Sequence, residues 1–197
     1  FAQRGLLDGG MLLDPVGTTI EGTLSGQGLS RSGLSLARLA ANVKLRGGTG
    51  EVRASFAGSR GRSFDIQSVA QVSAGRVELI GSGSIDRKPV KLISPALLMR
   101  EAGGWRLSPT TLEFAGGRIL TAGLFGTRTT EFDASVTRMP LTILDVAYPQ
   151  LGLGGSASGA MSYRVVNGGL PDGKANIRIS GLTRSGLVLT SKPLDLG

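Results

Sequence analysis

The chain has 197 residues, with 22 Lys plus Arg against 14 Asp plus Glu and a formal net charge of +8. Glycine supplies 32 of these residues, about twice the usual ~7%, which disfavours a helical bundle because glycine weakens helix interiors by roughly 1 kcal/mol per residue. Cysteine and histidine are absent, which excludes disulfides, thiolate nucleophiles, a Ser-His-Asp triad and His/Cys zinc sites. No run reaches the ~20 uncharged apolar residues that span a bilayer.

Apolar and polar residues alternate along most of the chain. In the segment 51–56, Val52, Ala54 and Phe56 share one side of an extended backbone, and the polar residues between them share the other. The pattern recurs in 64–72, 77–85, 131–136 and 174–179. It is typical of antiparallel strands with one dry and one wet face. Roughly twelve such runs, separated by glycine-rich turns, predict an all-β fold built as an elongated, curved antiparallel sheet.

The segment 139–148 departs from this alternation and predicts one short helix that bridges two groups of strands. Pro140 is placed for a first helical turn, and Pro149 would stop the helix. Helical spacing falls on Leu141, Leu144 and Ala147. A weaker helical candidate, 34–41, also alternates from Leu39 onward, so we favour strand from that residue.

Two motifs match patterns that are found in nucleotide-binding sites or in catalytic sites. Residues 152–157 fit the Gly-x-Gly-x-x-Ala dinucleotide fingerprint, but that motif needs a strand before it and a helix after it. Here the predicted helix precedes it and an alternating run follows, so we expect a glycine-rich entry to a strand. Glu131 and Asp133 share one side of a strand. A solvated strand face accounts for them better than a carboxylate pair for glycan cleavage, and we expect no enzyme, no cofactor and no metal site.

The positive charge is scattered, and almost all of it is arginine. Nucleic-acid binding would favour a basic cluster interleaved with aromatic side chains, so we expect no nucleic-acid partner. Contact with anionic lipid headgroups accounts for scattered arginines better than nucleic-acid binding does. A solvated outer surface that keeps a long sheet soluble remains the favoured interpretation.

The dry faces carry most of the functional information. They could close on themselves as a sandwich or barrel core, or they could form an open trough that holds an apolar ligand. Small residues such as Gly81, Gly83 and Ala134 leave room on these faces, whereas native cores interlock large side chains. The candidates for lining an open lipid groove are Val52, Phe56, Phe64, Ile66, Val77, Leu79, Phe114, Phe132, Val136, Met161, Ile177 and Ile179.

Three segments, 90–119, 139–159 and 177–182, resemble the TamB family, the inner-membrane component of the translocation and assembly module. They share its recurring order of Leu-x-Pro, a glycine pair, a short strand and a further glycine. AsmA-like relatives share the same order. The resemblance extends over most of residues 45–197 and rests on turns and strands, with no catalytic signature.

The resemblance implies a periplasmic β-taco, a long sheet folded into a hydrophobic trough. It further implies tethering to the inner membrane by an anchor absent from this chain, and pairing with a TamA-type outer-membrane barrel. The implied roles are phospholipid transport between the membranes, with acyl chains in the groove, and outer-membrane protein assembly. We therefore expect residues 1–197 to be a single segment of a longer β-trough protein, with a helix-marked junction near 139–150. The alternative is a structural or passenger-type β protein with a closed core and no lipid ligand.

Overall fold

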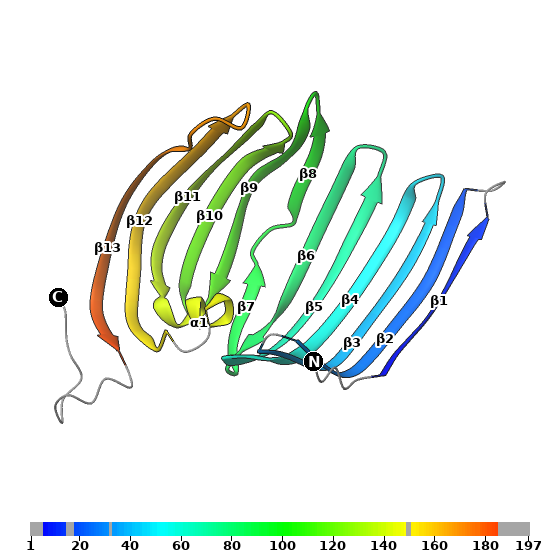
Figure 1. Cartoon of the computed structure of the whole chain (residues 1–197), viewed down its shortest axis with the longest axis horizontal. Helices are drawn as coiled ribbons and strands as arrows, with labels where there is room; N and C mark the ends of the chain where they lie inside the picture. The colour runs from blue at the N-terminus through cyan, green and yellow to red at the C-terminus, as the bar shows by residue number, and fades with distance from the viewer. Residues whose placement is uncertain (1–5, 15–17, 32, 149–150, 185–197) are drawn as a thin grey trace.

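The computed structural model describes residues 6–14, 18–31, 33–148 and 151–184. These residues form one antiparallel sheet of 13 strands (Figure 1), which confirms the predicted all-β, elongated and curved architecture. The strands are β1 (Leu6–Asp14), β2 (Thr19–Arg31), β3 (Leu34–Arg46), β4 (Thr49–Arg60), β5 (Arg62–Ser73), β6 (Arg76–Ile85), β7 (Lys88–Leu92), β8 (Ala96–Glu101), β9 (Gly104–Phe114), β10 (Gly117–Gly126), β11 (Thr129–Pro140), β12 (Leu153–Val166) and β13 (Asp172–Arg184).

Neighbours in sequence are neighbours in the sheet, with one exception. β7 and β8 share a single position between β6 and β9, each pairing with a different half of those strands. The break between them contains Pro95. Because proline has no N–H to donate to a ladder, it interrupts what would otherwise be one strand.

Residues 34–41 belong entirely to β3, so the strand begins five residues earlier than the alternation from Leu39 indicated. Leu36 and Arg38 flank a shift in the register with β4. This irregularity explains why the alternation is broken there, since an extra residue in one strand moves later side chains to the other face.

The predicted helix is present but shorter than 139–148. It consists of a 3-10 turn, η1 (Leu141–Ile143), followed by α1 (Leu144–Ala147). Pro140 is extended and ends β11 instead of opening the helix, and Pro149 lies outside the described residues. The sheet continues across this junction, because β11 pairs directly with β12.

The side chains of η1 and α1 form a second layer over part of the sheet. The predicted face of Leu141, Leu144 and Ala147 is only partly correct, since Leu141 is buried but Leu144 is exposed. Ile143 and Val146 instead pack on the sheet, because the chain enters as a 3-10 turn with three residues per turn. They cover a buried cluster made by Ile85, Val90, Phe114 and Met139.

The sheet curves around this helical segment. The segment follows directly from β11, yet α1 also contacts β4, which lies several strands away in the sheet order. Partly buried side chains from intervening strands converge on the same cluster: Phe64, Ile66, Leu112, Ile119 and Val136. The apolar side is therefore concave where the helical segment lies, at the lower edge of the sheet in Figure 1.

Glycine at two positions permits close contact between strands. A Cβ at Gly83 would clash with the backbone carbonyl of Asp65, and one at Gly159 would clash with that of Asn176. Gly81 has no such restriction. Gly83 and Gly159 therefore allow neighbouring backbones to approach, in addition to leaving the dry face free of a side chain.

Candidate functional site: an apolar sheet face

The strand register places all twelve candidate groove residues on one face of the sheet. Residues directly opposite in neighbouring antiparallel strands point to the same side. Phe56 lies opposite Ile66 and Phe64 opposite Ile85; across β10 to β13, Ile119, Val136, Gly159 and Ile177 form one continuous row. The two halves are joined through Val90 and Phe114. We call this surface the apolar face.

The twelve residues differ in how far protein covers them. Phe114 is only 1% exposed and lies in the cluster beneath the helical segment, so it belongs to a packed core and is not part of an open surface. Phe64, Ile66 and Val136 pack against that cluster. Away from it, Ile179 is 43% exposed. Side chains that are half-buried by neighbours on the same face are Val52, Phe56, Val77, Leu79, Phe132, Met161 and Ile177.

Aromatic rings form local pairs on the apolar face. The ring of Phe56 meets that of Phe64 edge to face at 6.0 Å between centroids. The ring of Phe132 stacks on that of Tyr163 at 5.5 Å. Tyr163 was not among the groove candidates, nor were Trp105 and Phe125, which lie opposite each other on the same face. Phe125 alternates with Ile119 in β10 and Tyr163 alternates with Met161 in β12, which was the signal that could have found these two.

The apolar face also extends through β1 to β3, where the sequence analysis named no candidate. A hollow of about 560 Å³ lies there. Apolar side chains that line it are Met11, Ile20, Leu24 and Val43. Glycine alternates with these residues in β1 and β2, which weakened the hydrophobic signal even though the period of two is kept.

The opposite face is polar and rich in ion pairs between neighbouring strands. Glu113 accepts from Arg118 at 3.0 Å and lies 3.6 Å from Lys91. Glu131 pairs with Arg164 at 3.6 Å. These pairs agree with the interpretation of Glu131 as part of a solvated face. Exposed pairs of this kind contribute about 0–1 kcal/mol each.

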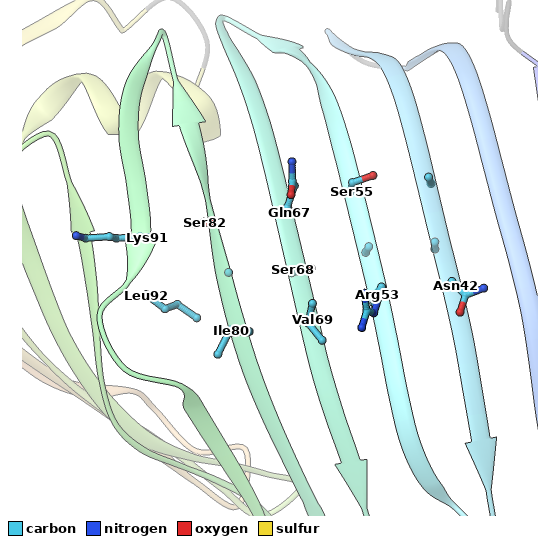
Figure 2. Close-up of a pocket in the computed structure, with 14 residues that line it drawn as sticks. Asn42, Arg53, Ser55, Gln67, Ser68, Val69, Ile80, Ser82, Lys91 and Leu92 are labelled. Carbon is cyan, nitrogen blue, oxygen red and sulfur yellow. The ribbon is translucent and has the colours of Figure 1, made fainter.

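Figure 2 shows a hollow of about 610 Å³ whose labelled side chains come from β3 to β7. Side chains of the polar face dominate it, including Asn42, Arg53, Gln67 and Lys91. Small residues such as Ser55 and Ser82 leave this depression between longer side chains. None of the twelve candidates lines it.

An ion-pair network fixes the helical segment to the sheet. The guanidinium of Arg62 donates to Asp145 at 2.7 and 2.9 Å and to Asp86 at 2.8 Å. The Asp145 side chain is 4% exposed and also accepts from the backbone N–H of Gly152 at 3.0 Å. Hydrogen bonding to Asp145, and then to Asp86, raises the pKa of Arg62. Burial raises the pKa of Asp86, but hydrogen bonds from Arg62 and Ser63 outweigh it and the pKa is lowered.

The remaining motifs show no arrangement for chemistry. Residues 152–157 lead into β12 and not into a helix, so the context that the dinucleotide fingerprint requires is missing. Among the described residues, no acidic side chains gather in a group that could hold a metal ion. None of the helices in this part of the chain is long and apolar enough to cross a membrane.

Residues 6–14, 18–31, 33–148 and 151–184 form an antiparallel sheet with one apolar and one polar face, and within these ranges a helical segment covers the apolar face at one place. Comparison with models of protein families, with curated proteins and with solved structures finds no match in any of the three.

Proposed function

We propose that the apolar face holds the acyl chains of phospholipids. The observation that carries the proposal is a continuous apolar face over which the described residues place a second protein layer at only one part. Soluble monomers rarely leave apolar patches larger than a few hundred Å² facing water, and larger ones mark interaction sites. Burying apolar surface gains about 25 cal/mol per Å², so covering this face with acyl chains is favourable.

The biological role that fits this ligand is that of a TamB-like periplasmic segment. Such a segment would carry phospholipid between the inner and outer membranes, assist outer-membrane protein assembly, or both. Its partners would be a TamA-type outer-membrane barrel and, through an anchor elsewhere in the longer protein, the inner membrane. The support is the strand-and-glycine order in 90–119 and 139–159, together with the agreement between that order and an apolar sheet face. No chemical step is required of the chain in this role.

A closed structural β protein is the second candidate. The cluster around Phe114 favours it locally, because protein covers that part of the face. Within the described part of the chain, nothing comparable covers Ile179 or Leu24, which are exposed on the same face. The lipid role is therefore the better supported of the two.

Photocrosslinking tests the proposal. A photoreactive residue at position 79 or 132 should crosslink to phospholipid, because both positions lie on the apolar face. Position 80 is the matched control, since Ile80 is 50% exposed but points to the polar face. Lipid adducts at 79 and 132 but not at 80 support the proposal; equal labelling at all three, or none, rejects it.

A further inference from the structure

The apolar face of β9 to β12 has two different ends. At one end, Phe114 and Met139 lie under Ile143 and Val146 of the helical segment. At the opposite end of the same strands none of the residues that the structure describes provides such cover, and Phe125 and Tyr163 are exposed there. The face is therefore closed and dry at the helical end and open at the other.

Aromatic side chains concentrate at the open end. Trp105 lies opposite Phe125 across β9 and β10. Phe132 lies one row further in and stacks on Tyr163. Trp and Tyr have an apolar body and a polar tip, and they are enriched where hydrocarbon meets water.

Cationic side chains flank the apolar face at both ends. At the helical end, Arg62 is bound to both Asp86 and Asp145. At the open end, Arg100 lies opposite Trp105 on the apolar face, and Arg128 lies in the turn beside Asn167, whose N–H donates to the Arg128 carbonyl. Both are exposed, and neither takes part in an ion pair among the described residues. The open end therefore offers positive charge beside an apolar surface.

The distance between the two ends suits an acyl chain. Phe125 and Ile119 lie on the same face of β10, six residues apart, which corresponds to about 20 Å at the rise of an antiparallel strand. One leaflet contributes about half of the ~30 Å hydrocarbon thickness of a bilayer. An acyl chain parallel to the strands would therefore run from the aromatic end to the helical segment.

We propose that β8 to β12 bind a phospholipid in one orientation, with its anionic phosphate at the edge that carries Arg100 and Arg128 and its methyl ends toward the helical segment. This rests on the proposed lipid function and adds the orientation and the headgroup site. Arginine binds phosphate oxygens through a planar, bidentate fork. The apolar side chains of the helical segment cover the methyl ends, which need no polar partner.

The chain contains a single tryptophan, Trp105, and it lies at the proposed headgroup end. The test uses the whole chain and phosphatidylglycerol with bromine placed either near the glycerol or near the methyl end of the acyl chain. Bromine quenches indole fluorescence at short range. We expect the lipid brominated near the glycerol to quench Trp105 more strongly than the lipid brominated near the methyl end.

The arginines are tested in the same assay. Replacing both Arg100→Gln and Arg128→Gln should weaken phosphatidylglycerol binding about thirtyfold, because each cation near an anionic lipid surface contributes about 1 kcal/mol. Lys174→Gln with Arg178→Gln is the matched control, since it removes the same charge from the polar face of β13. Inorganic phosphate alone should not displace the lipid, which separates a lipid headgroup from free phosphate as the ligand.

The outcomes separate this inference from the proposed function. Stronger quenching by bromine near the methyl end would reverse the orientation and place the headgroup beside Arg60, whose Nε is buried without a partner at the helical end. Equal quenching by both lipids, or equal loss of binding in the control variant, would also overturn the inference while leaving lipid binding intact. Absence of quenching by either lipid would reject the lipid function itself.

Discussion

Two phenylalanines on the same face of the sheet have different surroundings. Phe114 is 1% exposed in the cluster beneath the helical segment, whereas Phe132 is half-buried and contacts Tyr163 on the open part of the face. Both stand in alternating strands of similar composition. The difference shows that the second layer of protein, and not the pattern within the strand, decides which part of the apolar face becomes a core.

The largest expected effect comes from truncating the covered ring. Phe114→Ala should lower the free energy of unfolding by about 3–5 kcal/mol, because it leaves a cavity that the surrounding cluster fills only partly. Phe132→Ala is the matched control and should lower it by about 1–2 kcal/mol, since the site is already partly open. Urea unfolding measures both. Equal losses would show that the two sites are covered alike.

The next effect tests what holds the second layer in place. Asp145→Ala should lower the free energy of unfolding by about 2–3 kcal/mol, because it removes a buried partner of Arg62 and the acceptor for the Gly152 N–H. Glu78→Ala is the control, because it removes a carboxylate from the exposed pair with Arg76. It should change the free energy of unfolding by less than about 1 kcal/mol. If Asp145→Ala lowered the free energy of unfolding by as little as Glu78→Ala does, the ion-pair network would not be what fixes the helical segment to the sheet.

A charge on the open face should be tolerated in folding. Leu79→Arg should lower the free energy of unfolding by about 1 kcal/mol, well below the several kcal/mol expected for an unpaired charge in a sealed core. Phe132→Asp should behave in the same way. Thermal unfolding compared with that of Ile80→Arg, on the polar face, provides the measurement. Failure of Leu79→Arg to fold while Ile80→Arg folds normally would favour the closed structural protein.

The smallest expected effect is the pH dependence of the stability that the ion-pair network of Arg62, Asp86 and Asp145 contributes. The pKa of Asp86 is lowered in the folded chain, so the stability it contributes is present above its ordinary pKa of about 4 and is lost as the pH falls through the folded pKa. The unfolding free energies of the parent and Asp86→Asn should differ by less than about 1 kcal/mol at neutral pH. Titration should show this difference shrinking below about pH 4. A constant difference down to strongly acidic pH would contradict the assignment.

The strand alternation predicted the sheet and the common face of the twelve candidates well, because a period of two fixes the side of every residue once the register is set. It also indicated the helix near 139–148. It could not show that Phe114 would be covered, since that depends on where Ile143 and Val146 come to lie. The partners of Asp145 were equally hidden, because Arg62 is 83 residues away in the sequence.

The lining residues at Trp105, Phe125 and Tyr163 were missed for a different reason. In β9, the register shift against Thr121 and Gly123 leaves Trp105 on the same face as Phe114 although a strict period of two would place them on opposite faces. Such a bulge is visible only once the strands are paired, and it hid Trp105. Phe125 and Tyr163 keep the alternation of Ile119 and Met161, so they could have been named from the sequence.

The central claim is that one face of the sheet, and only that face, carries acyl chains. The most direct measurement is the amount of phospholipid bound to the purified chain by native mass spectrometry, compared between the parent, Leu79→Arg and Ile80→Arg. We expect bound phospholipid in the parent and in Ile80→Arg and its loss in folded Leu79→Arg, because a charge in hydrocarbon is disfavoured by roughly 2.5 kcal/mol or more. Equal lipid content in all three, or none in the parent, would contradict the account.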